Sequence, residues 1–171
     1  MGSKQQADIK VFLTDNLEGH AARELFARQS ALLRELISNV SGKSAEQAKT
    51  LEETILPRVA LYKALMGSSL PHERARELMR SYMMDVVAAQ KHAFTNKAQV
   101  IPGFFGIYKH VFLHTMRTSD LWESTEDHGR DYFDASITKC LWHDACVENG
   151  CPELCLSLIH ISEPTRLQLI S

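Results

Sequence analysis

The chain has 171 residues, of which 44% are hydrophobic and 23% charged, and its formal net charge is −2. This length suits a single domain with a real core, and the composition is that of an ordered globular protein rather than a disordered or collagen-like one. The balanced charge, without a block of Lys or Arg, disfavours binding to nucleic acid or to an anionic membrane surface.

Hydropathy and the placement of the cysteines predict a cytoplasmic protein. No apolar segment follows the N-terminus as in a secretory signal, and no stretch approaches the roughly 18 to 20 apolar residues that span a membrane. All four cysteines lie between Cys140 and Cys155, whereas the disulfides of a secreted scaffold would connect distant loops. We therefore expect reduced thiols gathered at one site.

Apolar residues at helical spacing predict four amphipathic helices, which cover about residues 20–40, 44–66, 71–94 and 104–112. Ser44 and Gln47 have the spacing of a capping box at the start of the second helix. Pro57 lacks an amide donor and crowds the carbonyl of Glu53, which predicts a kink or a restart at that point. Residues 118–130 are polar and are expected to form a loop.

Residues 132–138 combine aromatic and β-branched side chains with partial alternation, a pattern typical of a strand. One strand cannot satisfy its own backbone donors and acceptors, so we expect its partners in another chain or in sequence that this chain lacks. The predicted fold class is α+β: an N-terminal bundle of about four helices followed by the start of a C-terminal sheet, mostly α in this chain.

The cysteine-rich segment that follows carries the candidate chemistry. Asn149-Gly150 is a natural helix stop, so residues 141–148 are expected to form a short helix. Cys140 would then lie at a strand-to-helix junction, where free amides and the positive end of the helix dipole favour a thiolate. His143 and Asp144 should share a helix face with Cys140. A thiol, an imidazole and a carboxylate in this arrangement could carry out nucleophilic attack and proton transfer.

Two other interpretations of this segment stay open. In the first, Cys140, His143, Cys146 and Cys151 or Cys155 are soft ligands for zinc or iron in a non-enzymatic metal or redox module. The paired-cysteine knuckle of many zinc sites is absent, and three ligands at steps of three residues span about 120° of helix surface. In the second, the cysteines are buried core residues beside a core histidine, because free cysteine is commonly buried.

Two segments together are similar to a known family. Residues 55–65 read Ile-Leu-Pro-Arg-Val-Ala-Leu-Tyr-Lys-Ala-Leu, and residues 133–155 combine a strand that ends in Lys-Cys with a short helix and Gly-Cys-Pro-Glu-Leu. These features resemble the Pro-kinked helix and the later signature of the L-2-amino-thiazoline-4-carboxylic acid hydrolase family. The resemblance implies hydrolytic opening of a cyclic isothiourea to N-carbamoyl-L-cysteine, with no cofactor.

The resemblance also implies roles for individual residues. Cys140, His143 and Asp144 would be catalytic, Tyr62 would contact the substrate, and Lys139 or an arginine further downstream would hold the substrate carboxylate. The expected partner is a small-molecule substrate, and self-association into a homo-oligomer is left open. A sensor domain that binds a small ligand without converting it is the remaining alternative.

The last residues are interpreted as foreign to the protein. Residues 156–166 read Leu-Ser-Leu-Ile-His-Ile-Ser-Glu-Pro-Thr-Arg and resemble one reading frame of the transposase adapter used to build sequencing libraries. We therefore expect one truncated hydrolase-like domain over residues 1–155 and a non-native tail over residues 156–171.

Overall fold

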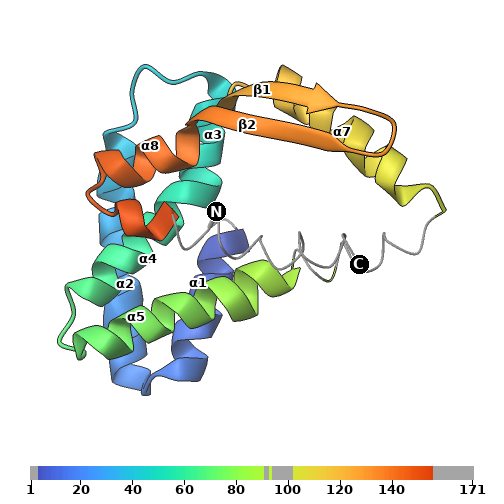
Figure 1. Ribbon diagram of the computed structural model, residues 1–171. Coiled ribbons are helices and arrows are strands. Elements are labelled where there is room, and N and C mark those ends of the chain that lie inside the picture. The colour runs from blue at the N-terminus through green and yellow to red at the C-terminus, as the bar shows by residue number, and fades with distance from the viewer. Residues whose placement is uncertain (1–3, 91–92, 94–101, 156–171) are drawn as a thin grey trace.

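A computed structural model describes residues 4–90, 93 and 102–155. The described part is mostly helical and has one two-stranded sheet near its C-terminal end (Figure 1), which confirms the predicted α+β class. The elements in chain order are α1 (Lys4–Asn16), α2 (Gly19–Ser38), α3 (Ala45–Thr50), η1 (Leu51–Ile55), α4 (Leu56–Met66), α5 (His72–Ser81), η2 (Tyr82–Ala88), α7 (Phe104–Thr118), β1 (Trp122–His128), β2 (Phe133–Cys140) and α8 (Leu141–Glu148).

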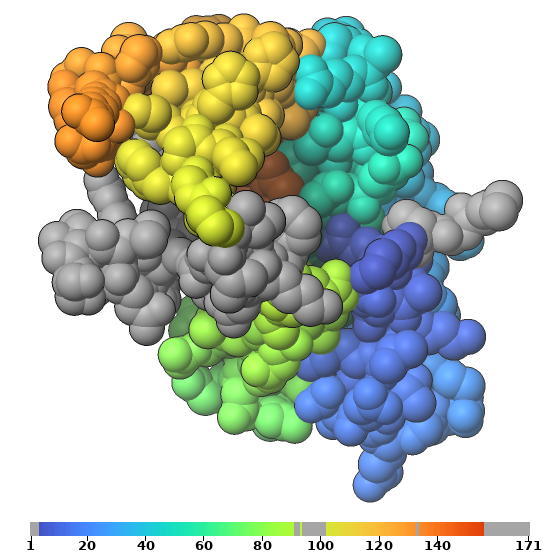
Figure 2. Space-filling view, turned by 90° about the vertical axis from the view of Figure 1, so that its right-hand side faces the viewer, coloured from blue at the N-terminus to red at the C-terminus, as the bar shows by residue number. Residues whose placement is uncertain are grey.

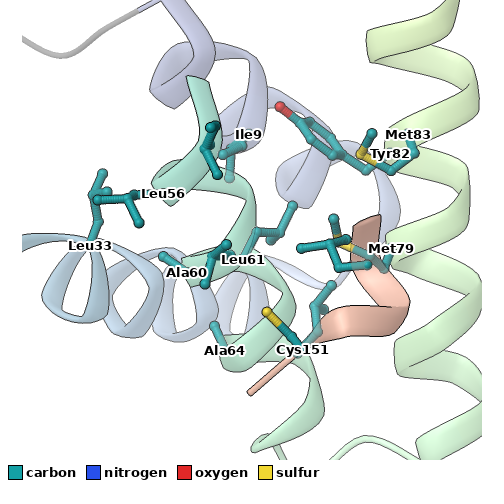
Figure 3. Packing of buried hydrophobic residues seen from close by; sticks show 14 of the residues in the cluster. Ile9, Leu33, Leu56, Ala60, Leu61, Ala64, Met79, Tyr82, Met83 and Cys151 are labelled. Atoms are coloured by element: carbon teal, nitrogen blue, oxygen red, sulfur yellow. The ribbon is translucent and has the colours of Figure 1, made fainter. Parts of the chain in front are cut away.

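Helix α4 lies at the centre of the helical bundle. Its apolar residues are buried on every side, because α2 covers one face while α1, α5 and the C-terminal turn cover the others (Figure 3). Leu61 and Leu65 are fully buried, and burial of one such side chain contributes roughly 1.5–3 kcal/mol. The core around α4 therefore determines where α8 packs.

Helix α1 is the first difference from the sequence prediction, in which the bundle begins near residue 20. Its apolar residues are few among Lys, Gln and Asp, but Ile9, Phe12 and Leu13 are all buried. The ring of Phe12 packs edge-on against Tyr82 of η2, with ring centroids 5.3 Å apart. The three apolar side chains are sufficient to make α1 part of the bundle.

The chain restarts its helix at Pro57, as predicted. A π-helical turn, η1, ends just before it, and Pro57 occupies the first turn of α4. The side-chain amide of Gln5 in α1 is assigned the orientation that satisfies both its nitrogen and its oxygen; its nitrogen then donates to the carbonyls of Glu53 at 2.9 Å and Thr54 at 3.1 Å. Because proline has no N–H for the carbonyl of Glu53, this side chain supplies the missing donor.

The two strands form an antiparallel hairpin. The register runs from Trp122 paired with Cys140 to His128 paired with Phe133, with a bulge between Glu123 and Ser124. The predicted loop over residues 118–130 is therefore wrong for β1, and so is the expectation that β2 lacks a partner within the chain. Most of β1 is polar, so its extended form follows from pairing with β2 rather than from β propensity.

Side chains of α3 fasten the start of the hairpin to the bundle. The predicted capping box is confirmed, because the Gln47 amide N–H donates to Ser44 Oγ at 3.1 Å and the Gln47 side chain accepts from the Ser44 amide at 3.2 Å. The side chain of Gln47 also donates to the carbonyl of Asp120 at 2.8 Å, and Ser119 donates to Glu46 at 2.9 Å. These contacts set the position from which β2 returns toward the bundle.

Helix α7 packs against the hairpin and extends to Thr118, past the predicted end near residue 112. Arg117 donates to Glu126 of β1 at 2.8 Å. In Figure 2, the yellow and orange atoms of α7 and the hairpin lie above the green atoms of α5 and beside the cyan atoms of α3. None of the described helices has both the length and the apolarity needed to cross a membrane.

Candidate active site

The junction between β2 and α8 has the predicted form. Cys140 is the last residue of the strand and the N-cap of the helix, with an extended backbone at φ −143° and ψ 119°. The Leu141 amide donates to the carbonyl of Leu121 at 2.8 Å, which joins the start of α8 to the start of the hairpin. Gly150, with φ +70°, ends the helix after Glu148. The short helix over residues 141–148 is thus confirmed.

His143 and Asp144 contact each other at the start of α8. His143 Nδ1 lies 3.4 Å from Asp144 Oδ1, and the His143 side chain is 57% exposed. Within the described ranges, no hydrogen bond joins the Cys140 sulfur to the His143 ring. Cys140 is half-buried and interacts electrostatically with Cys146 and Cys155. The imidazole is therefore mostly exposed to solvent, whereas the Cys140 side chain is half-buried.

The other three cysteines are core residues. Cys146, Cys151 and Cys155 are at most 1% exposed and belong to the cluster that packs around α4. Burial, followed by the charges of Cys140 and Asp144, raises the pKa of the Cys155 thiol. The interpretation as buried cysteines beside a core histidine is confirmed for the burial of these three cysteines. It is wrong for the histidine, because His143 is mostly exposed, and Cys140 is partly accessible.

The alternative metal centre is not assembled. Across residues 4–90, 93 and 102–155, no group of three or more His, Cys, Asp or Glu side chains is placed to hold a metal ion. The physical reason is the orientation of α8, which turns His143 toward solvent and Cys146 into the core beside Cys151. The predicted ligand set of Cys140, His143, Cys146 and Cys151 therefore does not converge on one point.

Tyr62 of α4 lies near Cys151 and Glu153 rather than near Cys140. Its hydroxyl donates to the Glu153 carboxylate, and it interacts electrostatically with Cys151 and Arg76. Burial of the phenol, reinforced by this hydrogen bond, raises the pKa of Tyr62 to about 12. The same bond lowers the pKa of Glu153. In this structure the hydroxyl is thus already occupied by a protein partner.

The raised pKa of Tyr62 predicts a specific loss of stability in alkali. A free phenol has a pKa of about 10, so the unfolded chain releases this proton more readily than the folded chain does. The stabilisation that comes from the higher folded-state pKa of Tyr62 is complete below about pH 10 and disappears as the pH rises to about 12. We expect the free energy of unfolding to fall less steeply over this window in Tyr62→Phe than in the unsubstituted chain. Urea titrations at several alkaline pH values measure this, and equal slopes would contradict the assignment.

Lys139 lies on the hairpin next to Cys140. Its ammonium is 3.4 Å from Glu123 Oε1 on β1, and both side chains are mostly exposed. Neighbouring residues of a strand project from opposite faces, so the Lys139 side chain leaves the sheet on the side away from Cys140. Its role in holding the substrate carboxylate stays a prediction.

Arg58 is a buried cation that the sequence interpretation missed. It is 8% exposed, and its guanidinium lies over the ring of Trp142 at 4.9 Å from the centroid. Its Nε donates to the side-chain oxygen of Gln5, and burial lowers its pKa. Within the described ranges it forms no ion pair with a carboxylate. Arg58 connects α4 to the helix that carries His143.

Glu153 is the second residue that the sequence interpretation did not single out. The signal was present, because Glu153 belongs to the Gly-Cys-Pro-Glu-Leu run that resembles the family signature. Arg58 likewise stands directly after Pro57 in the other matching segment. In both cases the residue type alone did not indicate a buried or tyrosine-bound side chain.

Comparison with known proteins supports the resemblance. The sequence profile described as L-2-amino-thiazoline-4-carboxylic acid hydrolase matches residues 48–163, and therefore contains α4, the hairpin, α8 and all four cysteines. The match ends within residues 156–171, which lie outside the described residues, so a non-native tail there stays a prediction. Comparisons with curated proteins and with solved structures gave no match. Since the match covers more than half of the chain and includes both segments that carry the motifs, the chain belongs to the L-2-amino-thiazoline-4-carboxylic acid hydrolase family.

Proposed function

We propose that this protein is a cytoplasmic hydrolase that opens a cyclic isothiourea of the 2-amino-thiazoline-4-carboxylate type. Membership of the family is the observation that carries this proposal. The location of Cys140, His143 and Asp144 at one helix start, inside the matched segment, supports it further.

The reaction adds one water across the bond between ring sulfur and the amidine-like carbon. In the covalent route, the Cys140 thiolate attacks this carbon, and the ring sulfur leaves as the thiolate of the opened substrate. Water then attacks the same carbon and displaces the Cys140 sulfur, leaving a urea. The product is N-carbamoyl-L-cysteine, which is heavier than the substrate by one water and carries a new free thiol.

His143 is assigned to proton transfer rather than to activation of the Cys140 thiol. No hydrogen bond connects the two side chains within the described ranges, and the exposed ring can meet a substrate or a water from the solvent side. Protonation of the departing ring sulfur and deprotonation of the attacking water are both within the chemistry of an imidazole. Asp144 Oδ1, at 3.4 Å from His143 Nδ1, would orient the ring.

The new thiol provides a direct test of this proposal. The purified chain is incubated with L-2-amino-thiazoline-4-carboxylate, and released thiol is followed with a chromogenic disulfide after the protein is removed by filtration. We expect thiol release above the uncatalysed rate and a product heavier by one water in mass spectrometry. The D enantiomer and heat-denatured protein are the controls. Retention of intact substrate without any thiol release would favour the ligand-binding sensor instead.

A further inference from the structure

The C-terminal end of α8 brings two cysteines together through its backbone. The Cys151 amide donates to the carbonyl of Cys146 at 2.9 Å, and the Gly150 amide donates to the carbonyl of Val147 at 3.0 Å. Gly150 has φ +70°, the left-handed conformation. These two bonds around a left-handed glycine define the Schellman motif, in which the residue after the glycine packs on the residue at the start of the last turn. That contact is usually between two apolar side chains, and here it is between two thiols.

The two thiols also interact with each other directly. The two thiols influence each other's proton, and this interaction raises the pKa of Cys146 and lowers that of Cys151. Burial and the charge of Glu153 raise the pKa of Cys151 and the positive charge of Lys63 lowers it, but the interaction with Cys146 is the largest cause and the net direction is downward. Cys151 is therefore the more acidic thiol of the pair, with the Cys146 sulfur beside it. This is the arrangement of an attacking and a resolving cysteine.

We propose that Cys146 and Cys151 form a reversible disulfide by exchange with small-molecule disulfides, which closes the end of α8 covalently. The Cys151 thiolate attacks one sulfur of the small disulfide, and one small thiol leaves. The Cys146 sulfur then loses its proton, attacks the Cys151 sulfur and releases the second small thiol. Two protein thiols and one small disulfide thus become one protein disulfide and two small thiols.

The position of the pair beneath a surface turn gives the exchange a route from solvent. Both side chains are at most 1% exposed, but Gly150, Pro152 and Glu153 around them are exposed. Figure 3 shows the sulfur of Cys151 pointing toward α4, so the turn must open briefly before a small disulfide reaches it. The other cysteines lack this backbone bridge, because Cys140 is on the strand side of α8 and Cys155 lies beyond the turn.

The sequence allows this disulfide to be mapped without ambiguity. Folded, reduced protein is treated with oxidised glutathione, the remaining thiols are alkylated, and the chain is cut after Lys, Arg and Glu. Residues 140–148 then carry Cys140 and Cys146, residues 149–153 carry Cys151, and a peptide that begins at Leu154 carries Cys155. We expect a crosslink between the first two peptides and loss of two of the four thiols. Dithiothreitol should restore all four.

Two variants identify the partner within residues 140–148. Cys140→Ser should keep the crosslink, whereas Cys146→Ser should abolish it and leave Cys151 as a mixed disulfide with glutathione. A crosslink to the peptide that begins at Leu154 would overturn the proposal, as would a crosslink that survives in Cys146→Ser. Alkylation of all four cysteines in the treated wild-type chain would also overturn it, and that result needs no variant to fold.

Discussion

Replacing Cys140 with alanine is expected to lower kcat for thiazoline opening by about 10²–10⁴-fold, the range in which a catalytic side chain usually contributes. The covalent route has no nucleophile without this sulfur, because the other cysteines are buried at 1% exposure or less. His143→Ala should lower kcat over a similar range by removing proton transfer to the leaving sulfur. Steady-state kinetics of thiol release, with fold checked by circular dichroism, measure both effects.

The Cys140→Ala and His143→Ala variants also distinguish the covalent route from direct attack by a water molecule that His143 holds. If His143 holds the attacking water itself, Cys140→Ala will retain most of its turnover while His143→Ala loses it. His110→Ala is the control, because His110 is an exposed residue of α7 outside the candidate site. Full turnover in both Cys140→Ala and His143→Ala would show that the reaction occurs elsewhere on the protein.

Arg58→Ala is expected to destabilise the fold by about 2–4 kcal/mol, the largest effect on stability that we predict for a charged residue. The substitution removes the cation above Trp142, leaves the Gln5 oxygen without its donor, and opens space where the arginine stem packs. Arg58→Met should cost only about 1 kcal/mol or less, because it keeps the stem and no longer requires a buried charge. Urea unfolding of the purified variants measures these differences.

The comparison of the two substitutions distinguishes packing from charge. Arg34→Ala serves as the control, since Arg34 is exposed on α2 and its loss should change the free energy of unfolding by no more than about 0.5 kcal/mol. Equal losses in Arg58→Met and Arg58→Ala would show that the guanidinium interactions, rather than the aliphatic stem, hold α8 against α4.

Helices could be predicted where their apolar residues repeat along one face and where capping residues mark their ends. The capping box at Ser44 and the restart at Pro57 depend only on neighbouring residues, so local patterns were enough. Helix α1 was missed because three buried side chains among many polar ones leave little periodic signal. Its helical form depends on contacts with residues far along the chain, such as that between Phe12 and Tyr82.

Prediction of the sheet and of the site from the sequence was limited for the same reason, because both depend on contacts between segments that are distant in the chain. Strand β1 has a polar sequence, and only its register with β2 makes it a strand. The junction at Cys140 could be predicted from the change of period and the Asn149-Gly150 stop, but the outward turn of His143 depends on how α8 docks. The approach of Cys151 to Cys146 could also have been predicted from Asn149-Gly150, because a left-handed glycine at a helix end determines which residues come together there.

The hydrogen bonds from the Gln5 side chain to the turn before Pro57 affect where this protein can be cut into stable fragments. The family profile begins at residue 48, whereas α1 and α2, which cover α4, lie entirely before it. A fragment cut at that boundary would expose the apolar faces of α4 to water and leave the carbonyl of Glu53 without its amide partner. We therefore expect that the matched segment does not fold on its own, because α1 and α2 supply the apolar surface against which α4 packs.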